Sequence, residues 1–333
     1  MRATRLFDVG DIRTVEVPEP TPHPGDIVIA VEAAGICGTD RHLFKGEFPS
    51  VPGNTLGHEF SGTVVDAGTS DLKIGTRVTC DPNTWCGSCP HCRAGRVNLC
   101  SRNVATGIAR DGGFAEYCAF PAHKAHCLPA DLDPLHGAFC EPLACTLHGM
   151  DIGQTAPGER VLVIGGGVIG LLAVQLAARA GGTVMLLTRS AEKQALGQRL
   201  GAALVAGTPE EVREVWPEGA DLVVECAGVA ATVETSPALT RTGGRVVVLG
   251  VLPQGERVSI EPFDLLFREI QIHFSFLNPF THERAAQMIA EGSIDVAPLV
   301  SRTLSIEEAP DAIANPPRAG EVRAIVVPGQ TAV

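Results

Sequence analysis

The chain has 333 residues, with 38 acidic against 26 basic side chains and a formal net charge of −12. This length allows two folded domains, and an acidic chain without a dense Lys/Arg run argues against a nucleic-acid partner. No uninterrupted apolar stretch of about 18 residues occurs, and the N-terminus lacks the pattern of a signal peptide. We therefore expect a cytoplasmic protein with no membrane partner.

The order of the expected elements changes near residue 150. Before it, short strand-like runs alternate with Gly and Pro, as at 26–32, 60–66 and 75–80, which predicts a mostly β domain. From residue 159, apolar strands alternate with helices. Strands are expected at 161–164, 184–188, 220–226 and 245–249, and helices at 168–180, 191–200 and 231–239. Continuous apolar strands with crossover helices predict a parallel sheet covered on both faces.

The remaining elements lie toward the C-terminus. A strand at 269–276 would place Ile270, Ile272, Phe274 and Phe276 on one face, and as the expected sheet edge it is a candidate subunit contact. Helices at 282–291 and 306–314 and a closing strand at 322–327 follow.

Four cysteines lie within fifteen residues: Cys86, Cys89, Cys92 and Cys100. Their spacing is typical of a tetrahedral Zn²⁺ site closed entirely by thiolates. A closed site has no position left for substrate, so a catalytic metal would need a second, open site.

An open site is predicted upstream. Cys37, His58 and Glu59 offer one sulfur, one nitrogen and one oxygen ligand. Three protein ligands leave the fourth position of Zn²⁺ for water or substrate, which is the arrangement a Lewis-acid catalyst requires.

A glycine-rich loop follows the first strand of the second region. The strand at 161–164 runs into Gly165-Gly-Gly167-Val168-Ile169-Gly170, and a helix is expected immediately afterwards. Gly165 permits the tight turn, Gly167 lets the backbone approach a pyrophosphate, and Gly170 allows close packing of helix on strand. The loop therefore predicts a dinucleotide whose phosphates lie at a helix N-terminus.

The end of the second strand bears on the choice of cofactor. An acidic residue there favours NAD, but this chain has Thr188, Arg189 and Ser190, with Lys193 nearby. These side chains could bind a 2′-phosphate, so the sequence favours NADP. The alternative is that Arg189 is a solvated surface cation and that an acid from elsewhere selects NAD.

Together these motifs resemble the zinc-dependent medium-chain dehydrogenases, most closely the sorbitol/xylitol/polyol dehydrogenase branch. The resemblance runs over essentially the whole chain and rests on Cys37-Gly-Thr-Asp40, Gly57-His-Glu59, the four cysteines, Asp111-Gly-Gly-Phe-Ala-Glu-Tyr117, Glu141-Pro-Leu-Ala144 and Gly165–Gly170. It implies an α/β chain with a GroES-like β-barrel catalytic domain, residues 1–151 and 286–333. A Rossmann domain with a doubly wound parallel sheet, residues 152–285, would be inserted between them, and the active site would lie in the cleft.

The resemblance also implies roles for single residues. Cys37, His58 and Glu59 resemble the catalytic zinc ligands, and Glu141 resembles a nearby carboxylate that binds the metal in some states. Asp40 would orient His58. Thr39 would take the proton from the alcohol, and His42 would pass it on. The four-cysteine site would hold a second, structural zinc.

The activity implied is reversible, NAD(P)-dependent oxidation of a secondary hydroxyl on a polyol or sugar alcohol, by a homodimer or homotetramer. Two alternatives stay open. An L-threonine 3-dehydrogenase would use the same zinc and nucleotide parts, and a non-catalytic regulator could bind zinc and nucleotide without turnover.

Overall fold

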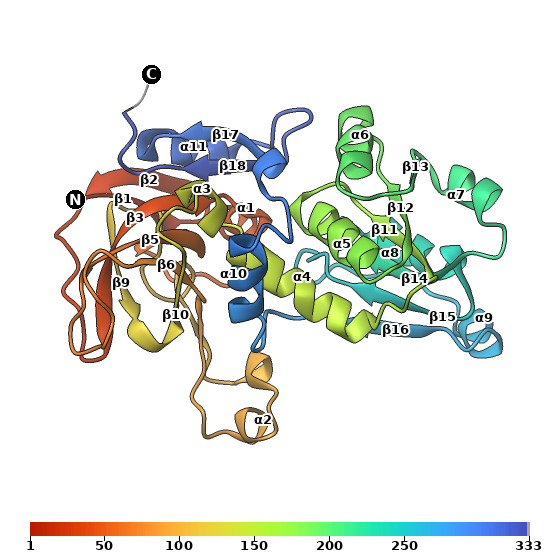
Figure 1. Ribbon diagram of the computed structural model, residues 1–333, viewed down its shortest axis with the longest axis horizontal. Helices are drawn as coiled ribbons and strands as arrows, with labels where there is room; N and C mark the ends of the chain where they lie inside the picture. The colour runs from red at the N-terminus through yellow and green to blue at the C-terminus, as the bar shows by residue number, and fades with distance from the viewer. Residues whose placement is uncertain (332–333) are drawn as a thin grey trace. The chain divides into compact units, whose positions relative to one another are not determined.

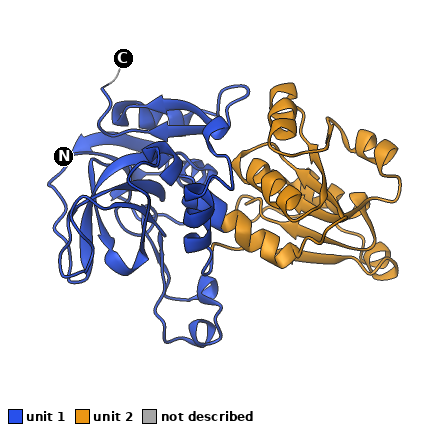
Figure 2. Cartoon of the chain, viewed as in Figure 1, with its two compact units in different colours: residues 1–144, 279–333 blue, residues 145–278 orange. Residues whose placement is uncertain are grey.

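The chain divides into two compact units in the computed structural model, which describes residues 1–331. Unit 1 comprises residues 1–144 and 279–333, and unit 2 comprises residues 145–278 (Figure 2). The boundaries expected from the sequence, 151/152 and 285/286, each fall seven residues further along the chain. The first division lies within helix α4 (Cys140–Gly153), which continues through residue 144 without a break.

Unit 1 is built mainly of antiparallel strands (Figure 1). Its seven-stranded sheet has the order β10-β6-β5-β3-β18-β17, and β9 also pairs with β3. The strands are β3 (Asp26–Gly35), β5 (Glu59–Asp66), β6 (Arg77–Cys80), β9 (Tyr117–Pro121), β10 (Ala125–Cys127), β17 (Val300–Leu304) and β18 (Arg323–Val326). Phe60 and Phe120 pack edge to face in its core, with ring centroids 5.6 Å apart.

Shorter elements surround this sheet. The other strands of unit 1 are β1 (Arg2–Asp8), β2 (Asp11–Glu16), β4 (Asn54–Thr55), β7 (Asn83–Thr84) and β8 (Val104–Ala105). Its helices are α1 (Gly38–Lys45), α2 (Pro90–Arg93), α3 (Pro134–Gly137), α10 (His282–Ala290) and α11 (Ala309–Ala314). The C-terminal segment completes the sheet, because β18 pairs antiparallel with β3.

Unit 2 contains a six-stranded parallel sheet of order β13-β12-β11-β14-β15-β16. The strands are β11 (Arg160–Ile164), β12 (Thr183–Leu187), β13 (Leu204–Ala206), β14 (Ala220–Glu225), β15 (Thr240–Val248) and β16 (Gln271–Phe274). The helices are α5 (Val168–Arg179), α6 (Ala191–Arg199), α7 (Pro209–Val215), α8 (Ala230–Thr235) and α9 (Pro262–Phe267). The order reverses between β11 and β14, as in a doubly wound Rossmann sheet. The predicted fold class is confirmed.

Several expected elements of unit 2 have other limits in the structure; β15, for example, begins at Thr240 rather than at 245, and the limits of two more have a clear physical cause. The helix expected at 231–239 ends at Thr235 and continues as a 3-10 turn, because Pro237 has no N–H to donate. The edge strand is also shorter than expected, because Glu269 and Leu277 adopt φ values of 48° and 59° and interrupt extended backbone. Phe274, at the end of β16, is 70% exposed.

Candidate metal centres and cofactor-binding edge

Helix α1 fixes the position of Cys37. Cys37 is the N-cap of this helix, and the carboxylate of Asp40 accepts a hydrogen bond of 2.8 Å from the Cys37 backbone N–H. This reciprocal capping arrangement holds the first turn and therefore the direction of the thiol. Asp40 is fully buried.

The sheet register brings the other two candidate ligands beside Cys37. Gly35 at the end of β3 pairs with Glu59 at the start of β5, so residues adjoining both positions meet. The ligand atoms of Cys37, His58 and Glu59 all lie within 4.8 Å of one another. A Cβ at Gly35 would stand 2.4 Å from Oε2 of Glu59, so glycine at this position leaves room for that carboxylate.

Asp40 lies beside the His58 ring. Its Oδ1 is 3.5 Å from Nδ1 of His58, which leaves Nε2 as the nitrogen available to a metal. Thr39 lies close to the same centre, with its hydroxyl oxygen 3.8 Å from the Cys37 sulfur. His42, one turn along α1, contacts Glu47 through Nδ1 at 2.7 Å.

Arg323 is a residue of this centre that the sequence analysis missed. It is buried at the start of β18, donates from Nη2 to Oε1 of Glu59 at 3.0 Å, and donates from Nη1 to the carbonyl of Ile36. A lone arginine opening an otherwise apolar strand was the available signal, since arginine is rarely buried unless it is paired.

The electrostatics of the centre suit a divalent cation. Burial disfavours the Cys37 thiolate, but His58 and Arg323 outweigh it and lower the pKa of Cys37 to about 6. Burial raises the pKa of Glu59 well above its usual value, although Arg323 opposes the shift. Oε2 of Glu59 is buried without a hydrogen-bond partner in the described residues. A thiolate, an imidazole nitrogen and an unpaired carboxylate oxygen fit Zn²⁺.

Glu141 lies in the first turn of α4 and is buried. Within residues 1–331, the group of potential ligands around Cys37 comprises Cys37, His58 and Glu59 and does not include Glu141. The ligand atoms that converge around Cys37 therefore do not include the carboxylate of Glu141.

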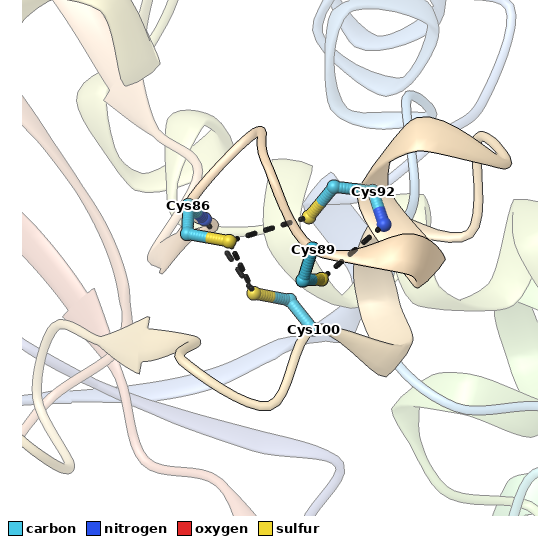
Figure 3. Close-up of side chains that lie close together, drawn as sticks. All are labelled: Cys86, Cys89, Cys92 and Cys100. Carbon is cyan, nitrogen blue, oxygen red and sulfur yellow. Dashed lines mark hydrogen bonds between the residues drawn. The ribbon is translucent and has the colours of Figure 1, made fainter.

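The four cysteines converge in the segment around α2 (Figure 3). The Cys86 sulfur lies 3.5 Å from that of Cys100 and 4.0 Å from that of Cys92. Four thiolates about 2.3 Å from one tetrahedral zinc stand about 3.8 Å apart. The observed spacing fits a closed zinc site.

Backbone and cationic donors surround these thiols. Backbone hydrogen bonds near Ser88 and Cys89 lower the pKa of Cys86 to about 5. The Arg102 guanidinium donates to the Cys86 sulfur at 3.2 Å and to the Ser88 hydroxyl at 2.8 Å. Burial and the neighbouring thiols raise the pKa of Cys92 to about 12, so a metal bound by the four cysteines would have to displace the proton of Cys92.

In unit 2, the glycine loop joins β11 to α5. Gly165 has a φ of +107°, and a Cβ at Gly170 would lie 1.8 Å from the Gly165 carbonyl oxygen. Gly167 is the N-cap of α5 and makes no side-chain cap, and a Cβ there would enter open space. Its backbone and those of Val168 and Ile169 at the start of α5 therefore form an open cradle that fits a pyrophosphate.

The side chains after β12 lie beside this loop. A Cβ at Gly166 would stand 3.0 Å from the Thr188 hydroxyl and 3.0 Å from Cβ of Lys193. Ser190 caps α6 by accepting from the Lys193 backbone N–H, and it donates to Glu192 at 2.8 Å. Arg189 is exposed.

Both units match known protein families. Residues 23–130 match the alcohol dehydrogenase GroES-like domain, and residues 168–292 match the zinc-binding dehydrogenase family. A sorbitol dehydrogenase from Halalkalibacterium halodurans is 34% identical over 90% of each chain. A D-arabinitol dehydrogenase from Uromyces fabae is 32% identical over 91% of this chain and 90% of its own length.

The fold of the chain is also similar to that of a solved structure. A zinc-binding dehydrogenase from Sinorhizobium meliloti 1021, bound to NADP, is 54% identical with a TM-score of 0.95, covering 98% of this chain and 99% of that one. No helix within residues 1–331 has the length and apolar character needed to cross a membrane. The chain therefore belongs to the zinc-dependent alcohol dehydrogenases of the medium-chain superfamily, in the branch of the polyol dehydrogenases, and is an oxidoreductase.

Proposed function

We propose that the protein catalyses the reversible, NAD(P)-dependent oxidation of a secondary hydroxyl on a polyol or sugar alcohol, with Zn²⁺ held by Cys37, His58 and Glu59. The observation that carries the proposal is the convergence of these three ligand atoms within 4.8 Å, one of them a buried carboxylate oxygen without a partner. When bound, Zn²⁺ supplies a Lewis acid for the alcohol oxygen and the nicotinamide supplies the hydride acceptor.

The residues of α1 support the proton transfer. Thr39 places a hydroxyl beside Cys37, where it can accept the proton that the alcohol loses. His42 is half-buried and contacts Glu47 through Nδ1, so it is placed one turn further along α1 to pass that proton on to solvent. Asp40 orients His58 through Nδ1.

A second zinc is proposed at the four cysteines. The sulfur spacing and the lowered pKa of Cys86 support it. Four thiolates saturate the tetrahedral ion, so this zinc would stabilise the segment and take no part in the reaction.

NADP is proposed as the preferred cofactor. The chain has no carboxylate at the end of β12. Thr188 and Lys193 both lie beside Gly166, and the exposed Arg189 stands between these two residues in the sequence. The relative from Sinorhizobium meliloti carries NADP in its structure, which supports the same preference here. Glu192 opposes it, since its carboxylate already engages Ser190.

A homodimer or homotetramer is proposed through the edge of unit 2. The strand β16 ends the sheet order, and Phe263, Leu266, Phe267, Phe274 and Phe276 are exposed on and near it. An unpaired strand edge next to exposed aromatic side chains is typical of an interface between subunits.

The substrate class is tested by a panel of polyols, sugars and L-threonine assayed with NADP and NAD. Turnover of polyols is the expected result, since sorbitol and arabinitol dehydrogenases are among the relatives. Exclusive turnover of L-threonine would favour the alternative of an L-threonine 3-dehydrogenase. Another relative of the chain is an enzyme of that name. Bound zinc with no turnover of any alcohol would favour the non-catalytic regulator.

A further inference from the structure

Glu225 is a fully buried carboxylate at the C-terminal end of β14, and the reaction described above gives it no part. Its Oε1 accepts hydrogen bonds from the backbone N–H groups of Ala227 at 2.8 Å and Gly228 at 3.0 Å. The Thr232 hydroxyl, in the first turn of α8, lies 2.7 Å from the same oxygen. One carboxylate oxygen thus ties together the turn after β14 and the helix that follows it.

This turn is packed between two other backbone segments. On one side, a Cβ at Gly250 would lie 2.3 Å from the Gly228 nitrogen and 2.5 Å from Oε2 of Glu225. On the other side, a Cβ at Gly165 would lie 3.0 Å from the Ala227 nitrogen. The turn at 226–228 therefore touches the glycine loop and the segment after β15, with glycine at each close approach.

The location of the turn connects it to cofactor binding. Ligands of open parallel sheets bind beyond the carboxyl ends of the strands, where the strand order reverses. That reversal lies between β11 and β14, the strands followed by the glycine loop and by this turn. Cys226, Ala227 and Gly228 have small side chains or none, so nearby groups rather than their own packing must fix the backbone.

We propose that Glu225 is a positioning residue for the cofactor, holding the backbone of the 226–228 turn against the glycine loop through Oε1. The inference rests on the proposed function, because it assumes that NAD(P) binds at this edge. If Oε1 is removed, the backbone N–H groups of Ala227 and Gly228 lose their acceptor, and the Thr232 hydroxyl keeps only the Val229 carbonyl, 2.8 Å away. The turn is then free to leave the conformation that the cofactor requires.

The carboxylate is held there at an energetic cost. Burial raises the pKa of Glu225, and the hydrogen bonds from Thr232, Ala227 and Gly228 work against that shift. An apolar side chain would fill the same space without this cost, as replacements of buried polar groups show in other proteins. A role limited to filling the core therefore gives no reason for a glutamate.

The test compares variants that differ in the contact to Oε1. Thr232→Val removes one donor with little change of volume, and Glu225→Leu removes the acceptor. Glu225→Gln keeps an oxygen that can accept. Thr235→Val is the matched control, because Thr235 lies on the same helix and its hydroxyl donates to the Ala231 carbonyl at 2.6 Å instead. Dissociation constants for NADPH and NADH are measured by nicotinamide fluorescence, and melting temperatures are measured without cofactor.

The expected result is weaker binding of both cofactors, on the order of tenfold for Glu225→Leu and severalfold for Thr232→Val. The dissociation constants of Glu225→Gln should be close to those of the wild type, and those of Thr235→Val should equal them. Wild-type dissociation constants in Thr232→Val and Glu225→Leu would overturn the proposal, as would lowered melting temperatures with unchanged dissociation constants. If Glu225→Leu does not fold, Thr232→Val decides. A wild-type protein that binds neither cofactor contradicts the proposed function itself.

Discussion

At the residue scale, a single buried arginine connects the electrostatics of the candidate catalytic centre. Arg323 pairs with Glu59, and its charge also helps to lower the pKa of Cys37. Protons compete with Zn²⁺ for both groups, so lower pKa values mean tighter metal binding at a given pH. Arg323 therefore favours metal binding although it neutralises part of the charge that attracts the metal.

Replacing Arg323 with Met should raise the pKa values of both Cys37 and Glu59. Because the pKa of Cys37 is about 6 in the wild type, protonation of this thiolate should weaken zinc binding to the wild-type protein mainly below pH 6. In the variant, zinc binding should begin to weaken at a higher pH, so a chelator should remove more zinc from it than from the wild type between about pH 6 and 8. Zinc retention against a chelator across this range measures the effect.

The same variant should be less stable by about 3–5 kcal/mol, because it leaves a buried carboxylate without its partner. Arg13→Met is the control, since Arg13 pairs with Asp11 on the surface. A pH dependence of zinc retention identical in Arg323→Met and the wild type would contradict this role.

Arg189 tests the cofactor preference. If it binds a 2′-phosphate, Arg189→Ala should lose a charge-assisted interaction of about 1.5–3 kcal/mol, which raises KM for NADP on the order of 10- to 100-fold. KM for NAD should change little, and Arg199→Ala, at the exposed end of α6, should alter neither. Equal effects on both cofactors would exclude a specific contact with the phosphate.

Some of these residues could be predicted from the sequence and others could not. Cys37, His58 and Glu59 were predicted because metal ligands are restricted to few residue types, and the register of β3 and β5 does bring them together. Arg323 was missed because its contact with Glu59 joins positions 264 residues apart, which no local pattern records. Glu225 was missed because its partners are mainly backbone N–H groups.

At the element scale, the segment between Cys86 and Cys100 has little regular structure of its own. Its elements are the four-residue α2 and a three-residue 3-10 turn. Its shape must therefore depend on what joins the four sulfurs.

Cys92→Ser should remove the structural zinc while leaving the reaction intact. Closing a fifteen-residue loop contributes about 3 kcal/mol, which corresponds to a fall in Tm of roughly 6–12 °C for a unit of this size. Calorimetry, metal content and kcat check this expectation, with Cys127→Ser as the control because Cys127 is exposed. A variant that loses kcat but keeps its Tm would assign the segment a catalytic role instead.

The strand β16 allows a test of the proposed assembly. Phe274→Asp places a charge at the exposed end of β16, where Phe274 and Phe276 are both exposed. Light scattering should show a smaller oligomer for the variant than for the wild type. Burying the new carboxylate in the interface would cost more free energy than the contact at this position contributes. Val215→Asp, an equally drastic change at an exposed site on α7, should leave the mass unchanged. A wild-type mass in Phe274→Asp would place the interface elsewhere.

Element types were predicted more reliably than their ends. The alternation of apolar strands and helices in unit 2 was sufficient for the doubly wound sheet, whereas the limits of β16 and α8 depended on backbone angles and on Pro237. Helix α1 was not anticipated at all. It is short, and what defines it is the capping contact between Asp40 and Cys37.

At the scale of the whole molecule, each unit supplies one half of the proposed reaction. Unit 1 holds the two candidate metal centres, and its sheet is completed by the C-terminal strands β17 and β18. Unit 2 holds the glycine loop and the side chains that follow β12. We propose that zinc bound by Cys37, His58 and Glu59 is what makes the chain a dehydrogenase.

Zinc content and NADP-dependent polyol oxidation are measured in the wild type, Cys37→Ser and Cys127→Ser. We expect two zinc ions per chain in the wild type and in Cys127→Ser. Cys37→Ser should retain one zinc and its circular dichroism, while its rate falls on the order of 10³-fold, since a Lewis acid contributes several kcal/mol. A Cys37→Ser protein that keeps the wild-type rate, or a fully active protein stripped of zinc, would show that the reaction does not need zinc at Cys37.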